Sequence, residues 1–105
     1  MEIKFDKKYL EELYKVGKTT DKKYKFQPDI VKRYQARIKT LEKASIIEDL
    51  FTINSLHYEV LKGDKKGISS VRVNEQYRIE FKTTQVVSET VATICDILEL
   101  SKHYK

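Results

Sequence analysis

Residues 61–81 decide the fold of this chain and read LKGDKKGISSVRVNEQYRIEF. Gly63 and Gly67 bracket a lysine-rich turn, and glycine lets a backbone turn tightly and approach a ligand closely. Apolar and polar residues then alternate over 68–73 and again over 77–83, which is the pattern of two β-strands. The stretch therefore predicts a basic turn followed by a β-hairpin.

The register of this hairpin follows from which face has to be buried. A two-residue loop at 74–75 would turn Arg78 into the apolar face and bury its charge. A three-residue loop at 74–76 instead pairs Arg72 with Arg78 and separates the two kinds of side chain, so we expect this loop. It predicts one face with Ser70, Arg72, Arg78 and Glu80, and an opposite, core-facing set of Val71, Val73, Tyr77, Ile79 and Phe81.

Two arginines directly opposite each other repel, so the sequence must offset their charge. One solution is a surface network of salt bridges through Glu80 and Asp64. The other is a bound phosphate, which the planar guanidinium group contacts with two parallel hydrogen bonds. We favour the phosphate and expect Arg78 to face solvent, so that its removal would leave folding intact. Further candidates for binding RNA or phosphate are Lys62, Lys65, Lys66 and Ser70.

The remaining segments predict a small α+β domain. Apolar spacing indicates two main helices, the first capped by Asp6 and ended by Gly17, the second starting at Pro28. A turn or two of helix is expected over 46–51. Further strands are expected at 1–5, 56–61 and 91–98. We therefore expect an N-terminal strand, two helices and an antiparallel sheet in a single domain, 1–105, because this length suffices for one core.

The composition indicates which class of partner and which cellular compartment to expect. A net charge of +5 and a pI near 9.2 favour a polyanionic partner. The single cysteine, Cys95, lies in an expected buried strand, which suits a reducing compartment. No apolar run is long enough to span a bilayer and the N-terminus has no signal-peptide pattern, so we expect a cytoplasmic protein without a membrane partner.

Few side chains can carry catalysis. The cysteine and the two histidines are too scattered for a metal site, and no nucleotide-binding or hydrolase motif is present, so we expect no cofactor. Metal-free RNA cleavage needs a base, a cationic group and an acid. Arg72 and Arg78 suit the cationic role, and His103, Tyr104 or a lysine suits the others. His57 is expected in the strand before the turn, on the face opposite to the core-facing Tyr58 and Val60.

The turn and hairpin resemble the HigB branch of the RelE/ParE toxin superfamily. In that branch an L-K-G-D-[RK]-x-G turn precedes a strand close to W-S-[IV]-R-[IV]-N and then a [WY]-R-[IL] strand. Arg78 matches the arginine of the last strand and Arg72 a basic position of the strand before it. Matches to the turn are Lys62, Gly63, Asp64 and Gly67.

This resemblance implies both a fold and an activity. It implies a strand, two helices and an antiparallel sheet with a basic concave face. It also implies a ribosome-dependent messenger-RNA endonuclease, an mRNA interferase that inhibits translation. The implied partners are the ribosome with its mRNA and a HigA-like helix-turn-helix antitoxin, with DNA reached only through the antitoxin complex.

The chain departs from this family pattern at two places. Relatives often carry a histidine four residues before the first motif glycine, where this chain has Glu59, with His57 two residues earlier. Relatives also tend to end their last strand in Asp-Tyr-His, whereas this chain ends in SKHYK, so His103 is the counterpart that the resemblance suggests. The alternatives are a ParE-like toxin that binds DNA gyrase and a basic RNA-binding module without catalysis.

Overall fold

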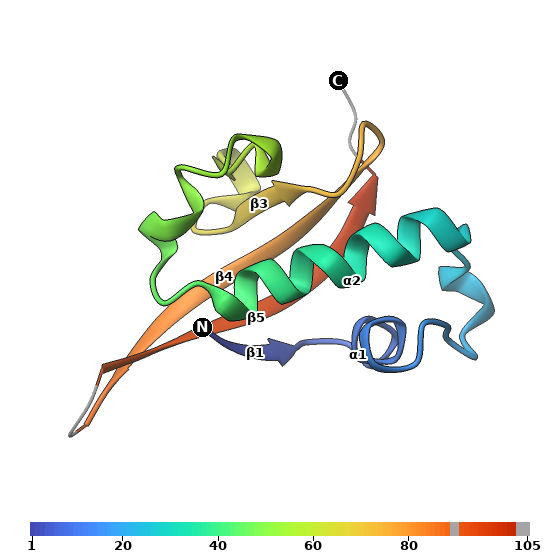
Figure 1. The fold of residues 1–105 in the computed structure, drawn as a ribbon, viewed down its shortest axis with the longest axis horizontal. Helices are drawn as coiled ribbons and strands as arrows, with labels where there is room; N and C mark the ends of the chain where they lie inside the picture. The colour runs from blue at the N-terminus through green and yellow to red at the C-terminus, as the bar shows by residue number, and fades with distance from the viewer. Residues whose placement is uncertain (89–90, 103–105) are drawn as a thin grey trace.

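The computed structural model describes residues 1–88 and 91–102 as a five-stranded sheet with two α-helices (Figure 1). The order of strands across the sheet is β1-β5-β4-β3-β2. The strands are β1 (Glu2–Phe5), β2 (Glu59–Val60), β3 (Ser69–Arg72), β4 (Tyr77–Val87) and β5 (Val91–Lys102). The helices are α1 (Lys8–Lys15) and α2 (Pro28–Lys43), with 3₁₀ turns at Lys22–Tyr24, Ile47–Leu50, Asn54–Leu56 and Gly63–Lys65.

This order confirms the predicted α+β fold, with an antiparallel sheet that β1 joins in parallel. β1 pairs with β5, so that Glu2 lies opposite Ile94, while all the other neighbouring strands are antiparallel. β4 and β5 end at Val87 and Lys102 rather than at residues 83 and 98. The added residues, 84–87 and 99–102, continue the ladder, because backbone hydrogen bonds between strands do not depend on the kind of side chain.

The two helices begin and end close to the predicted residues. Gly17 follows α1 with φ of 87°, a left-handed conformation that favours glycine. Asp6 is not the cap of α1, because Lys7 precedes the helix and the Asp6 amide donates to Ile97 O at 2.8 Å, which prolongs the pairing with β5. Pro28 opens α2, where its missing N–H leaves no bond unmade.

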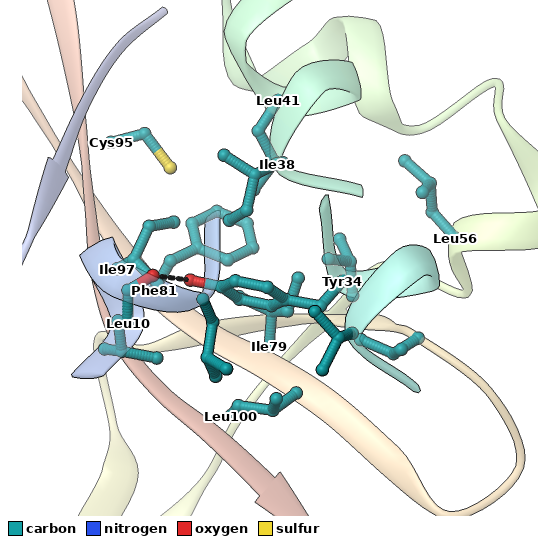
Figure 2. Close-up of a cluster of buried hydrophobic side chains, with 14 of the residues drawn as sticks. Leu10, Tyr34, Ile38, Leu41, Leu56, Ile79, Phe81, Cys95, Ile97 and Leu100 are labelled. Atoms are coloured by element: carbon teal, nitrogen blue, oxygen red, sulfur yellow. Dashed lines mark hydrogen bonds between the residues drawn. The ribbon is translucent and has the colours of Figure 1, made fainter. Parts of the chain in front are cut away.

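The core lies between the helices and one face of the sheet (Figure 2). α2 contributes the predicted apolar stripe, Ile30, Val31, Tyr34, Ile38 and Leu41. The Tyr34 hydroxyl donates to Leu10 O of α1 at 2.8 Å, which satisfies its polar end inside the core. Cys95 is fully buried in β5, as expected. In the 3₁₀ turn after α2, Leu50 is buried whereas Phe51 is half exposed.

The predicted hairpin register is confirmed. Arg72 lies opposite Arg78, and the Val73 amide donates to Tyr77 O at 2.9 Å. The loop is held by Asn74, whose Oδ1 accepts from the amides of Gln76 and Tyr77 at 2.8 and 2.7 Å. The expected core set is buried, with Tyr77 partly so.

The strand predicted over 56–61 was wrong in extent. Only Glu59 and Val60 pair with β3, and Val60 is 56% exposed rather than core-facing. The residues before them close a 3₁₀ turn that ends at His57, whose φ and ψ of 44° and 52° are left-handed. Leu56 is fully buried, so the chain uses this turn to place it in the core before it reaches the sheet. In the part of the chain that the structure describes, no helix is long and apolar enough to cross a membrane.

Candidate functional site

Arg78 stands at the centre of the polar face of the sheet. Its Nε donates to Ser70 Oγ of β3 at 2.8 Å, and its Nη2 donates to the carbonyl oxygen of His57 at 2.8 Å. The same Nη2 lies 3.5 Å from Glu59 Oε2 of β2. Three contacts from two segments, β3 and residues 57–59, therefore fix this guanidinium group in one orientation.

This arrangement overturns the expectation that Arg78 faces solvent, because the residue is only 6% exposed. The segment that carries His57 and Glu59 folds over the polar face and covers Arg78, which the alternation of residues within one strand could not reveal. Burial lowers the pKa of the Arg78 guanidinium, while Glu59 and Glu80 act in the opposite direction and Arg72 adds to the lowering. An arginine nevertheless keeps its charge in a protein.

Glu80 forms a second polar cluster beside Arg78. Its carboxylate accepts two hydrogen bonds from Lys65 Nζ, at 3.0 and 2.8 Å, and one from the hydroxyl of Ser101 in β5 at 2.8 Å. This hydrogen-bonded pair raises the pKa of Lys65. Glu80 thus neutralises a lysine of the turn, while Glu59 is the carboxylate that pairs with the sheet arginine. The salt-bridge network through Glu80 and Asp64, the alternative to a bound phosphate, was therefore wrong in its partners.

These residues line one cavity of about 300 Å³. Its wall carries both signs of charge, with basic side chains in excess. The lining residues are Glu59, Leu61, Lys62, Lys65, Ser70, Arg78, Glu80, Ser101 and Lys102. The turn reaches the cavity because Gly63 and Gly67 adopt φ of 68° and 89°, which bends the backbone back towards the sheet.

Arg72 opens into a different cleft, although it lies directly opposite Arg78 in the ladder. Its Nη1 lies 3.5 Å from His57 Nε2, and its carbonyl oxygen accepts a hydrogen bond from Arg37 of α2 at 2.9 Å. The imidazole of His57 lines the cleft of Arg72, whereas the carbonyl of His57 binds Arg78. The structure therefore divides the predicted site residues between two neighbouring hollows.

The sequence-predicted residues are distributed as follows. Arg78, Ser70, Lys62 and Lys65 come together at the cavity, and Arg72 and His57 lie at the adjoining cleft. Lys66 is exposed and lines neither hollow. His103 and Tyr104 lie outside the described residues, but they follow Lys102, which lines the cavity. Among residues 1–88 and 91–102, no three His, Cys, Asp or Glu side chains gather as metal ligands would.

Glu59 is the functional candidate that sequence reasoning passed over. It occupies the position at which relatives often carry a histidine, so in the sequence it is only a departure from the family pattern. The structure places its carboxylate in the cavity beside Arg78, with 56% of the side chain exposed. Its position in the motif could have identified Glu59 as a candidate base, because a carboxylate and an imidazole can both accept a proton.

Comparisons with known proteins agree with this fold. Residues 3–96 match a family model described as the HigB-like toxin, a RelE-like toxin of type II toxin–antitoxin systems. Toxin HigB-1 of Vibrio cholerae serotype O1 is 32% identical over 83 residues, which are 78% of this chain and 83% of that protein.

Two solved structures share the fold at lower identity. The YoeB/ParE toxin from Agrobacterium tumefaciens has a TM-score of 0.61 at 16% identity, over 99% of this chain and 100% of that one. The YoeB-YefM complex from Staphylococcus aureus has a TM-score of 0.54 at 19% identity, over 99% of this chain and 98% of that one. The family match and the HigB-1 identity together show that this chain belongs to the HigB-like, RelE-related toxins of type II toxin–antitoxin systems, whose partner is an antitoxin.

Proposed function

We propose that this toxin is an endoribonuclease that cuts messenger RNA on the ribosome, in the cytoplasm, without a metal ion. The observation that carries the proposal is the cavity in which Arg78 is held rigidly beside the Glu59 carboxylate. Family membership supports it, because RelE-type toxins act as ribosome-dependent mRNA endonucleases. We further propose a HigA-like helix-turn-helix antitoxin as the partner, with DNA contacted only in that complex.

The chemistry suited to this cavity is attack by the ribose 2′-hydroxyl on the adjacent phosphate. Glu59 takes the 2′-hydroxyl proton, the bond from O2′ to phosphorus forms, and the bond from phosphorus to O5′ breaks. The products are a 2′,3′-cyclic phosphate and a 5′-hydroxyl end. Arg78 and Lys62 stabilise the charge that builds up on the phosphoryl oxygens, where fixed donors act most strongly.

The acid that protonates the leaving O5′ comes from the C-terminal end in this proposal. Lys102 lines the cavity, and His103 and Tyr104 are the next residues in the sequence. An imidazole titrates near neutral pH, which suits proton transfer better than a phenol. His57 is assigned no proton transfer here, because its ring lies in the neighbouring cleft. Substituting His103 should therefore remove much of the activity, whereas substituting His57 should not.

The decisive experiment follows cleavage of a reporter mRNA in a translating extract, with and without active ribosomes. The wild type should cut only with ribosomes present and should leave 2′,3′-cyclic phosphate ends. Glu59→Gln should cut about 100-fold more slowly, as expected for loss of a general base. Glu48→Gln is the matched control, because this exposed carboxylate lies in the 3₁₀ turn after α2 and lines neither the cavity nor the adjoining cleft.

Four outcomes would contradict the proposal. A 3′-hydroxyl with a 5′-phosphate would point to another reaction. Equal rates for Glu59→Gln and the control would remove Glu59 from the mechanism. Inhibition of purified gyrase without RNA cleavage would favour the ParE-like alternative, and RNA binding without either effect would favour the non-catalytic module.

A further inference from the structure

A second cleft, of about 530 Å³, lies between α2 and the turn that joins β3 to β4. Three arginines from two elements line it, together with the imidazole of His57. The two acidic groups in its wall are Asp29 and Glu75. The full lining is Asp29, Arg33, Arg37, Ser55, His57, Arg72, Val73, Asn74, Glu75 and Gln76.

Within the described part of the chain, no acidic side chain neutralises the arginines of this cleft, and one of them is also held in place. Arg37 Nε donates to the Arg72 carbonyl at 2.9 Å, so its position on α2 is tied to the sheet. Among the described residues, Arg33, Arg37 and Arg72 have no acidic partner within 4.0 Å, whereas the buried Arg78 has Glu59. Burial and the neighbouring Arg33 both lower the pKa of Arg37. A cluster of this kind is stabilised by a bound anion.

The cleft also adjoins the cavity of Arg78. Arg72 and Arg78 are direct cross-strand neighbours, whose Cα atoms lie about 5 Å apart in an antiparallel ladder. His57 connects the two arginines, because its carbonyl accepts a hydrogen bond from Arg78 and its ring lies 3.5 Å from Arg72 Nη1. One extended polyanion can therefore pass from the cavity over Arg72 and into the cleft.

We propose that Arg33, Arg37 and Arg72 bind the phosphodiester backbone of an RNA segment that flanks the phosphate held at Arg78. This inference rests on the proposed function, since the cavity supplies the reacting phosphate. Guanidinium groups suit consecutive phosphates because each offers a planar fork of donors. Arg33 and Arg37 thus give one part of the α2 surface a specific role in this arrangement.

The test measures binding of a fluorescent, fully 2′-O-methylated RNA oligonucleotide, which cannot be cut, by anisotropy over a series of salt concentrations. The double variant Arg33→Gln, Arg37→Gln is compared with Lys32→Gln, Lys39→Gln. The control removes the same charge from the same helix at exposed positions that do not line the cleft. Binding to the cleft variant should weaken at least tenfold, and its salt slope should fall by about 1.4, or 0.7 for each lost phosphate contact.

Because Arg37 also bonds the backbone of β3, Arg33→Gln alone is measured as a second variant, with thermal melts of all forms. The exposed Arg33 has no hydrogen bond within the described part of the chain, so its variant should fold normally and still lower the slope. Equal weakening in the cleft and control variants would reduce the effect to overall charge and overturn the inference. Polyglutamate is also tested as a competitor of the labelled oligonucleotide. If it competes as strongly as unlabelled RNA, and does not compete in the cleft variant, the cleft is a site for an acidic peptide and the inference is overturned.

Two further measurements identify which RNA the cleft binds and test the proposed cleavage separately from binding to the cleft. Loss of oligonucleotide binding assigns the cleft to the mRNA strand, whereas loss only of co-sedimentation with vacant small ribosomal subunits assigns it to ribosomal RNA. The first outcome supports the proposal, and the second would overturn it, because ribosomal RNA is not the segment that flanks the reacting phosphate. Glu59→Gln should keep cleft-dependent binding while losing cleavage. A wild type that binds RNA through the cleft but never cuts it would therefore refute the proposed function without contradicting the inference that the cleft binds RNA.

Discussion

At the scale of single residues, Arg78 combines a structural role with a proposed functional one. The charge is buried, which is costly, and the cost is offset by Ser70, the His57 carbonyl and the Glu59 carboxylate. In the described residues every buried side-chain nitrogen or oxygen has a hydrogen-bond partner, so the cluster is fully satisfied. A rigid guanidinium needs no reorganisation when charge develops on a phosphate.

We expect Arg78→Ala to lower the free energy of unfolding by about 1–3 kcal/mol, because it leaves buried acceptors without their donor. Arg72→Ala is the matched control and should change stability by less than about 0.5 kcal/mol, since within the described residues its guanidinium has one hydrogen-bond contact, to the exposed His57 ring. Urea unfolding followed by circular dichroism measures both. Equal midpoints for Arg78→Ala and the wild type would show that the cluster contributes no stability. Loss of toxicity in this variant is therefore interpretable only beside its unfolding curve.

At the scale of elements, the β3–β4 hairpin determines which residues share the site. Its three-residue loop sets Arg72 opposite Arg78, and a shift by one residue would turn Arg78 into the core. Asn74 closes the loop through its side-chain oxygen, which replaces a backbone acceptor for two amides. The register of the proposed RNA-binding face thus depends on one asparagine outside both strands.

Asn74→Ala should destabilise the protein by about 1–2 kcal/mol, because the Gln76 and Tyr77 amides lose their common acceptor. Gln76→Ala is the control, since the exposed Gln76 side chain makes no hydrogen bond within the described residues. Thermal and urea unfolding report the difference. If both variants unfolded at the same midpoint, backbone pairing alone would be sufficient to hold the loop.

At the scale of the whole molecule, the core holds ionisable groups in their neutral forms. Burial raises the pKa of the Cys95 thiol from 9.0 to about 12 and that of the Tyr9 hydroxyl from 10.0 to about 12. It also raises the pKa of Tyr34, whose hydroxyl lies between the two helices. The folded protein therefore binds these protons more tightly than the unfolded chain does.

Stability should consequently be complete below pH 9 and should fall as the pH rises from 9 to about 12. Each group contributes a slope of about 1.4 kcal/mol per pH unit between its unfolded and folded pKa values. In Cys95→Ala the decline should begin nearer pH 10, where the tyrosines of the unfolded chain titrate. Urea midpoints measured from pH 7 to 11 test this. A flat profile, or an unchanged onset in the variant, would contradict the assignment.

Patterns within short stretches of sequence already determined the two helices, the hairpin register and the membership of its two faces. Alternation along a strand and the apolar stripe of α2 are local properties, so they appear in the sequence without knowledge of the rest of the chain. The basic turn and its two arginines likewise identified the region that forms the site.

Only the tertiary structure decided how that region is covered and divided. The parallel pairing of Glu2 with Ile94, the contact of Glu59 with Arg78 and the bond from Arg37 to Arg72 each join separate segments. No local period encodes such contacts, because they depend on how the chain between them folds back. For that reason the sequence indicated an exposed arginine pair, whereas the folded chain buries Arg78 beside Glu59 and leaves Arg72 in a separate cleft with two arginines of α2.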